Sequence, residues 1–203
     1  MPNQIGIIIL GAGASSRMGT PKQLLEWQGE SLVNRAIREA KALECGPVIL
    51  VLGANAPLIQ DTLVDADLLV AVNENWSSGM GSSIVAGLEK LLQIEPAIDA
   101  VLISLVDQPL INSTHLQLLI KKWQEKKVPV VAAFYEKSLG VPALFSTELF
   151  SEILTLSGKM GAKKIIHKYK DQLTKLPLPA AQIDVDTPEE WKSFLAQKNF
   201  GNF

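Results

Sequence analysis

The sequence predicts an α/β fold in which a mostly parallel sheet is covered by helices on both faces. Short runs rich in Val, Ile and Leu recur along the chain, and segments with helical periodicity separate them. The apolar runs are nearly continuous instead of alternating with polar residues, which is typical of parallel strands buried on both faces. The alternation of strand and helix predicts a Rossmann-like, three-layer α/β/α architecture.

The first two thirds of the chain hold the clearest elements. The predicted strands are the apolar runs at residues 5–10, 48–53, 68–72, 100–106 and 129–134. The predicted helices cover residues 32–43, 80–93 and 113–126. The last of these separates an apolar face from a charged face, as an amphipathic helix requires. Ligands of such folds bind beyond the carboxyl ends of the strands, so functional residues are expected there.

The pattern is weaker after residue 135. We expect strands at residues 141–145 and 182–186, and helices at residues 147–156 and 161–169. A final helix is predicted to begin at Thr187-Pro188, because Thr is a good N-cap, Pro suits the first helical position and Glu190 completes a capping box. Neither a repeat nor a linker divides the sequence, so we expect one domain over residues 1–203.

Composition limits the classes of partner. The 203 residues carry a formal net charge of -2, which gives no general attraction to nucleic acid or to a membrane surface. Cys45 is the one cysteine, so an intrachain disulfide and a Cys-rich zinc site are excluded. No apolar run approaches the roughly 18 residues of a membrane span, and no basic signal-like segment precedes residue 5. We therefore expect a cytoplasmic protein without nucleic-acid or membrane partners.

A glycine-rich loop follows the first strand. Residues 10–22 read Leu-Gly-Ala-Gly-Ala-Ser-Ser-Arg-Met-Gly-Thr-Pro-Lys, and small residues between glycines let backbone N–H groups approach a phosphate. Arg17 and Lys22 add two positive charges, which favour a phosphate clamp over a merely flexible turn. The loop lacks the Gly-Lys-Ser/Thr ending of a P-loop and the glycine spacing of a dinucleotide fold.

Acidic residues follow two further predicted strands. Asp107 comes directly after the strand at 100–106, where a carboxylate could ligate Mg²⁺ in the ligand cleft or could cap the turn before Pro109. Asp184 and Asp186 are expected on one face of the strand at 182–186, because strand side chains repeat every two residues. They could also be acids that favour the start of the last helix. The sequence leaves both alternatives open.

These motifs resemble a known family, the MobA-like nucleotidyltransferases, and in particular its molybdenum cofactor cytidylyltransferase (MocA-like) branch. The cytidylyl branch tends to read Leu-Ala-Ala-Gly and the guanylyl branch Leu-Ala-Gly-Gly; here the tetrad is Leu10, Gly11, Ala12 and Gly13, and Ala12 agrees with the cytidylyl branch. Residues 106–109 (Val-Asp-Gln-Pro) are similar to the family's Gly-Asp-Gln-Pro turn. Residues 183–190 are similar to its Asp-Ile-Asp-Thr-Pro-Glu-Asp segment, and residues 73–88 to the segment that contacts the base.

The resemblance spans nearly the whole chain and implies a nucleotide-diphospho-sugar transferase-like fold that transfers CMP from CTP to the phosphate of molybdopterin. It implies Mg²⁺, with Mn²⁺ as the alternative, held by Asp107 and Asp186, with Asp184 in reserve. The implied catalytic residues are Arg17, Lys22 and Asp107. The implied nucleotide-binding residues are Leu10, Gly11, Ala12, Gly13, Arg17, Lys22, Gly79 and Ser83. Residues 79–83 could otherwise be an ordinary serine-rich helix start.

Residues 135–170 are expected on the side of the phosphorylated small-molecule acceptor. Residues 140–145 resemble the family's Gly-His-Pro-x-Leu-Phe and residues 158–162 its Gly-Asp-x-Gly-Ala, but Val141 replaces the histidine and Lys159 the aspartate. The resemblance also implies a transient contact with a molybdenum hydroxylase. His115 and His167 are expected to be packed or solvated. The tryptophans expected to pack are Trp27, Trp123 and Trp191.

Two other functions remain open at this stage. A guanylyl-, sugar-phosphate or polyol-phosphate nucleotidyltransferase could use the same clamp. A protein of another class could retain the nucleotide fold but only carry and deliver the finished molybdenum cofactor. Arg17, Lys22 and Asp107 favour an enzyme, because a carrier needs no metal ligand beside an α-phosphate.

Overall fold

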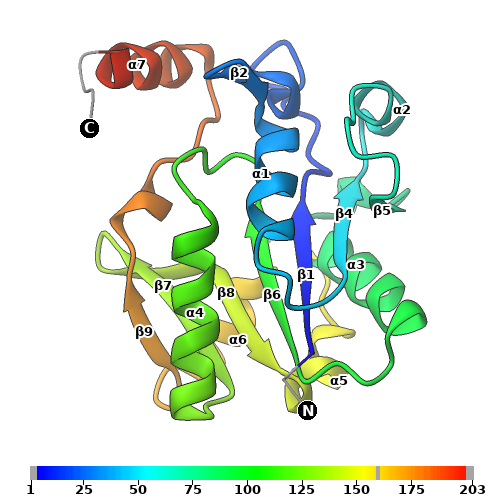
Figure 1. The fold of residues 1–203 in the computed structure, drawn as a ribbon, viewed down its shortest axis with the longest axis vertical. Helices are drawn as coiled ribbons and strands as arrows, with labels where there is room; N and C mark the ends of the chain where they lie inside the picture. The colour runs from blue at the N-terminus through cyan, green and yellow to red at the C-terminus, as the bar shows by residue number, and fades with distance from the viewer. Residues whose placement is uncertain (1–3, 159–160, 200–203) are drawn as a thin grey trace.

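The computed structural model describes residues 4–158 and 161–199 (Figure 1). The strands of its main sheet are β1 (Ile5–Leu10), β4 (Val48–Leu52), β5 (Leu69–Val72), β6 (Ala100–Leu105), β7 (Val130–Tyr135), β8 (Ser138–Ser146) and β9 (Thr174–Pro177). Within the described residues these form one seven-stranded sheet in the order β5-β4-β1-β6-β8-β7-β9. A hairpin of β2 (Glu26–Trp27) and β3 (Glu30–Ser31) stands apart.

The sheet is mostly parallel, which confirms the predicted fold class. β1 pairs in parallel with β4 and β6, β4 with β5, and β7 with β9. β8 is antiparallel to both of its neighbours, β6 and β7. The carboxyl ends of β1, β4, β5 and β6 therefore lie at the same edge of the sheet, and the loops that follow them can form a common cleft.

Helices cover both faces of the sheet, as Figure 1 shows. Apolar side chains of α1 (Leu32–Lys41) and α4 (Ser113–Lys126) form one core with Ile7 and Ile9 of β1. Those of α3 (Met80–Ile94), α5 (Phe150–Ile153) and α6 (Ala162–Lys168) form the opposite core with Ile8. The alternation of β1 side chains between two cores follows from the two-residue period of a strand. Burial on both faces explains its continuous apolar sequence.

The two remaining α-helices of the described residues are α2 (Ala56–Gln60), whose Ala56 and Ile59 join the core of α1 and α4, and α7 (Pro188–Asn199). Phe194 of α7 packs against Trp27 of the β2–β3 hairpin with ring centroids 5.0 Å apart, and Trp191 stacks on Phe194 at 5.4 Å. The Arg35 guanidinium lies 4.5 Å from the centroid of Trp27. The final helix is thus fixed to the segment that follows the glycine-rich loop. Among the described residues, no helix has the length and apolarity needed to cross a bilayer.

The predicted start of the final helix is confirmed. Thr187 Oγ1 accepts a hydrogen bond from the Glu190 backbone N–H at 3.2 Å, and the Glu190 carboxylate accepts from the Thr187 N–H at 2.9 Å. The same Glu190 oxygen accepts from the Asp186 N–H at 2.9 Å. The capping box therefore also fixes the backbone of Asp186.

The predicted strand at residues 182–186 is wrong. Residues 179–182 form the 3₁₀ helix η4 (Pro179–Gln182), and residues 183–186 are irregular. Pro179 starts the helical turn, and the Val185 N–H donates to the Asp107 carbonyl at 3.1 Å instead of joining a ladder. Asp184 and Asp186 still flank a buried residue, Val185, whose side chain is 1% exposed. The sequence did not predict α2, β9 or the β2–β3 hairpin.

Candidate active site

A pocket of about 570 Å³ opens at the carboxyl ends of β1 and β6. It is lined by the glycine-rich loop, the start of α3 and the turn after β6. The predicted site residues that line it are Leu10, Gly11, Ala12, Gly13, Lys22, Gly79, Ser83 and Asp107. Arg17 and Asp186 are not among its lining residues, but Asp186 is bound to Lys22, and Arg17 is bound to Asp186. Four segments distant in sequence thus meet at one site.

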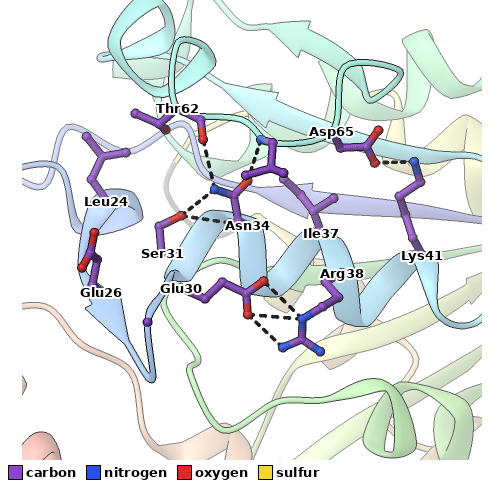
Figure 2. A pocket seen from close by; sticks show the side chains of 12 residues that line it. Leu24, Glu26, Glu30, Ser31, Asn34, Ile37, Arg38, Lys41, Thr62 and Asp65 are labelled. Carbon is purple, nitrogen blue, oxygen red and sulfur yellow. Dashed lines mark hydrogen bonds and ion pairs between the residues drawn. The ribbon is translucent and has the colours of Figure 1, made fainter.

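A larger hollow of about 730 Å³ lies beside α1 (Figure 2). Its polar groups are mostly paired with one another: Figure 2 shows Arg38 bound to Glu30 and Lys41 bound to Asp65. Asn34 is also occupied, because its Nδ2 donates to Ser31 and to the Thr62 carbonyl. None of the predicted site residues lines this hollow. The smaller pocket, where polar groups from four segments converge, is therefore the candidate active site.

The side chain of Gln23 is buried beneath the glycine-rich loop and forms hydrogen bonds to its backbone. Its Nε2 donates to the carbonyls of Gly11 at 2.6 Å and Gly13 at 3.1 Å. Ser15 links the two ends of the loop, because its Oγ donates to Gln23 Oε1 at 3.3 Å and accepts from the Lys22 N–H at 3.0 Å. The two bonds from Gln23 occupy the carbonyls of Gly11 and Gly13. The conformation of the loop is therefore fixed before a phosphate binds.

Lys22 lies between two carboxylates. Its Nζ is 2.9 Å from Oδ1 of Asp186 and also contacts Asp107. The guanidinium of Arg17 lies 2.6 Å from the other oxygen of Asp186. The side chains of Lys22 and Asp107 are 16% and 17% exposed, whereas that of Arg17 is 68% exposed. The partly buried Lys22 and Asp107 line the pocket, whereas Arg17 makes a solvent-facing contact with Asp186.

The charges in this cluster shift the pKa of Lys22, Asp184 and Asp186. Burial acts to lower the pKa of Lys22, but the carboxylates of Asp107 and Asp186 outweigh it and raise this pKa. Burial acts to raise the pKa of Asp186, but Lys22 and Arg17 hold it below its ordinary value. The pKa of Asp184 is raised by burial and by the neighbouring charges of Asp107 and Asp186. Three carboxylates therefore share this site with two cations.

The oxygen donors of this site fit a hard divalent cation whose remaining ligands come from substrate phosphates and water. Asp107 Oδ1 is buried and has no hydrogen-bond partner within the described residues. No cluster of three or more His, Cys, Asp or Glu side chains able to hold a metal occurs in the part of the chain that the structure describes. Mg²⁺ is commonly bound through one or two carboxylates together with substrate phosphates and water. Asp107 and Asp186 could supply such a pair, and the unpartnered Asp107 Oδ1 is an oxygen that could serve as a ligand.

The start of α3 forms the wall opposite the glycine-rich loop. Gly79 has φ 120°, which favours glycine, and it joins η2 (Trp76–Ser78) to the first residue of α3. Trp76 lines the pocket and packs on Gly53, where an added Cβ would lie 2.6 Å from the Trp76 Cβ. Ser83 is buried and lines the pocket one turn into the helix.

The region after β6 joins the pocket to β8. Gln108 is buried, and its Nε2 donates to the carbonyls of Val141 at 3.1 Å and Ala181 at 2.8 Å. Val141 thus contributes its backbone to this region, while its side chain is buried. The pKa of the half-buried Tyr135 phenol is raised by burial and by the charges of Asp184, Asp107 and Glu136. Lys159 lies outside the described residues.

The residues expected to be structural have structural contacts. His115 completes a capping box with Asn112 at the start of α4, and His167 is exposed on α6. Trp27 and Trp191 pack with Phe194, and Trp123 is buried in the α4 core. Gln23, Asn73 and Trp76 were not predicted as site residues. Their contacts depend on partners from other loops, although each lies within or beside a quoted motif.

Known proteins resemble this chain over nearly its whole length. Nicotine blue oxidoreductase of Paenarthrobacter nicotinovorans is 30% identical over 192 residues, which cover 90% of this chain and 92% of that protein. The crystal structure of Rv0371c from Mycobacterium tuberculosis H37Rv has a TM-score of 0.82 at 25% identity, covering 97% of this chain and 100% of that one. A structure of Rv0371c in complex with manganese has a TM-score of 0.79 at 23% identity, with 97% and 100% coverage.

The fold, the pocket and the sequence agree on one class of enzyme. Residues 7–173 match the family described as the MobA-like NTP transferase domain, a match that spans most of the 203 residues. The chain therefore belongs to the MobA-like NTP transferase family and is a nucleotidyltransferase.

Proposed function

We propose that this nucleotidyltransferase transfers CMP from CTP to the phosphate of molybdopterin and releases pyrophosphate. The observation that carries the proposal is the position of Lys22, which contacts both Asp107 and Asp186 beside the glycine-rich loop. This arrangement supports the proposal, because a cation and two potential metal ligands lie beside the loop that is proposed to bind the triphosphate. The proposal treats residues 1–203 as one catalytic domain acting in the cytoplasm.

The reaction is an in-line substitution at the α-phosphorus. An oxygen of the acceptor phosphate forms a bond to this phosphorus, the bond to the bridging oxygen of the β-phosphate breaks, and pyrophosphate leaves. The attacking phosphate is already anionic, so no general base is needed. Lys22 stabilises charge around the α-phosphorus, and Arg17 at the pocket edge stabilises the leaving pyrophosphate. Catalysis then depends on positioning and charge.

Asp107 and Asp186 would hold the divalent cation, with Asp184 as the neighbouring reserve. When bound, the cation neutralises charge on the phosphate oxygens. The structure of Rv0371c with manganese supports a divalent cation in this fold. We propose Mg²⁺ for this chain, with Mn²⁺ as the alternative, because carboxylate oxygens and phosphates suit both ions.

Two features of the pocket favour cytosine as the base. Ala12 follows the cytidylyl pattern of the loop, and Ser83 offers a buried hydroxyl to a base edge in the same pocket. We propose that residues 135–170, beyond Gln108 and Val141, form the acceptor side. Transfer of the product through a transient contact with a molybdenum hydroxylase is part of the same proposal.

A second candidate is a redox reaction, which is favoured by the name of the relative nicotine blue oxidoreductase. A hydride transfer does not require the pair of carboxylates that faces Lys22, so the geometry favours nucleotidyl transfer. The purified chain should therefore produce pyrophosphate without oxidising NADH or NADPH. Nucleotide-cofactor oxidation without pyrophosphate would favour the redox candidate.

The decisive experiment measures pyrophosphate release with each of the four nucleoside triphosphates, with and without molybdopterin. We expect release that requires CTP, molybdopterin and a divalent cation together, and that is lost in Lys22→Met. Release with GTP, or with sugar or polyol phosphates as acceptors, would assign a related nucleotidyltransferase. Binding of the finished cofactor with no pyrophosphate under any triphosphate would instead indicate a carrier.

A further inference from the structure

Arg35 lies on α1, and its side chain contacts three groups from different parts of the fold. The side chain is 15% exposed, and its guanidinium lies 4.5 Å from the ring centroid of Trp27 in the β2–β3 hairpin. Its Nε donates to the carbonyl of Pro109, in the turn after β6, at 3.1 Å. The carboxylate of Glu39, one turn further along α1, lies 4.0 Å from the guanidinium and orients it. Arg35 takes no direct part in the proposed reaction, yet a largely buried cation is costly to the fold unless its contacts are satisfied.

Two of these partners belong to the segments that carry carboxylates of the candidate active site. Pro109 comes two residues after Asp107 in the same turn. The ring of Trp27 packs on α7, and the capping box of α7 fixes the backbone of Asp186. The guanidinium of Arg35 therefore connects the turn that holds one carboxylate with the helix that follows the other.

One backbone hydrogen bond also joins these two segments directly. The Val185 N–H donates to the Asp107 carbonyl at 3.1 Å, and Val185 is 1% exposed. A single bond fixes a distance but not an orientation, because the two segments could still rotate about it. The contacts of Arg35 add a second point of attachment to each segment. Together, the bond and these contacts fix how the two segments are oriented relative to each other.

We propose, on the basis of the proposed function, that Arg35 is a positioning residue that holds Asp107 and Asp186 at the separation required by a divalent cation. It acts through Pro109 and Trp27, since Arg35 itself is not among the residues that line the active-site pocket. Mg²⁺ demands nearly ideal octahedral geometry, so a small shift of one carboxylate lowers its affinity. Substitution of residues that orient metal ligands typically lowers metal affinity by about 10- to 100-fold.

The first test measures Mn²⁺ affinity without nucleotide, from the electron paramagnetic resonance signal of the free ion. Arg35→Met removes both the charge and the Nε donor, and it should weaken Mn²⁺ binding by about tenfold or more. Loss of a nearby positive charge would by itself favour a divalent cation, so weaker binding must come from altered geometry. Arg38→Met is the matched control, because it removes the same charge from the same helix. The side chain of Arg38 is 54% exposed and pairs with Glu30 and Glu39, so this variant should not weaken binding.

A second readout is independent of metal, namely hydrogen exchange of the Val185 amide followed by NMR. The bond to the Asp107 carbonyl protects this amide. In Arg35→Met its exchange should become about tenfold faster, roughly the worth of one hydrogen bond in a local opening. The amide of Ile8, buried in the central strand β1, is the reference for global unfolding and should change much less. Equal acceleration of the two amides would indicate a merely destabilised fold and would overturn the proposal.

Arg35→Lys covers the case in which Arg35→Met does not fold. A single ammonium group cannot lie over Trp27 and bind the Pro109 carbonyl at once, so this variant should bind Mn²⁺ about threefold more weakly than the wild type. Wild-type affinity in either Arg35 variant would overturn the proposal. Pyrophosphate release is scored separately. Mn²⁺ binding by the wild type without release under any triphosphate would refute the transfer reaction alone, whereas release by the wild type with unchanged Mn²⁺ affinity in Arg35→Met would refute this inference alone.

Discussion

Nζ of Lys22 lies 2.9 Å from Oδ1 of Asp186, and the same nitrogen contacts the carboxylate of Asp107. One ammonium group thus joins the loop after β1, the turn after β6 and the segment before α7. Without this cation, two partly buried carboxylates would repel each other. With it, the two carboxylates are held side by side, as the proposed binding of a divalent cation by this pair would require.

Lys22→Met should lower turnover by about two orders of magnitude or more, because it removes a positioned charge at the reacting phosphate. Its raised pKa keeps Lys22 cationic through the neutral range, so no pH near neutrality should mimic the variant. Pyrophosphate release is the measurement, and circular dichroism checks that the fold is retained. Lys122→Met, which loses only a surface pair with Glu125, should remain fully active. Near-normal turnover of Lys22→Met would refute the assignment.

Asp107→Asn and Asp186→Asn should each raise the concentration of Mg²⁺ or Mn²⁺ needed for half-maximal turnover, by about tenfold or more. The amide retains one oxygen but loses the charge that holds a hard cation. Turnover is titrated against each metal at saturating triphosphate. Asp184→Asn should shift the titration less, and the exposed Asp171→Asn should not shift it. An unchanged metal titration in both ligand variants would remove the proposed metal site.

Gln23→Leu should weaken triphosphate binding by about tenfold and destabilise the fold by about 1–3 kcal/mol. The substitution leaves the carbonyls of Gly11 and Gly13 without their donor, so the loop is no longer fixed before binding. Calorimetry gives the affinity and urea unfolding the stability. Gln60→Leu, at an exposed position at the end of α2, serves as the control. Unaltered affinity would mean that Gln23 does not position the loop.

Phe194→Ala should destabilise the fold by about 3 kcal/mol, because it removes a buried aromatic ring. It should also lower turnover, since the contact of Phe194 with Trp27 fixes the helix that follows Asp186. Thermal unfolding and pyrophosphate release measure the two effects. Leu58→Ala, at a site 52% exposed, should change neither. A stability loss at full turnover would show that α7 does not position Asp186.

Glu39→Gln should make the free energy of unfolding less dependent on pH in the acid range. Burial acts to raise the pKa of Glu39, but the Ser113 N–H and the charges of Arg38 and Arg35 hold it below its ordinary value. A carboxyl with a lowered folded-state pKa stabilises the fold above its unfolded pKa, and this contribution is lost as the pH falls through the folded value.

At neutral pH the Gln variant should therefore be less stable by about 2 kcal/mol, with a difference that shrinks below about pH 4. Urea unfolding at a series of pH values measures this, with Glu89→Gln, an exposed change on α3, as the control. A constant difference at every pH would contradict the linkage.

The sequence could predict the elements whose signal is local. β1 is buried on both faces and therefore apolar throughout, and Asp107 follows a strand whose carboxyl end must face the cleft. Residues 182–186 were wrongly predicted as a strand because their sequence is strand-like. In the structure one backbone hydrogen bond, from the Val185 N–H to the Asp107 carbonyl, takes the place of strand pairing. β9 is short, and its pairing with β7 depends on a partner distant in sequence.

Part of the site could likewise be predicted, because the loop motif reveals its glycines and cations directly. The contacts that support the loop and the start of α3 could not be predicted from the sequence. Gln23 is an ordinary residue in sequence, and its importance follows from the two carbonyls that it holds. Asn73 donates to Ser82 and Ser83 at the start of α3 because of the direction of one amide, which only the surrounding backbone fixes. Such contacts join residues through three-dimensional proximity and leave little trace in a linear pattern.

The partners Lys22 and Asp186 are 164 positions apart, and the ribosome makes the first long before the second. A nascent chain therefore contains its glycine-rich loop and Asp107 while Asp184 and Asp186 are still to be synthesised. The glycine-rich loop is thus present during translation without the complete charge cluster. The order of synthesis thus delays assembly of the complete site until the final helix has emerged.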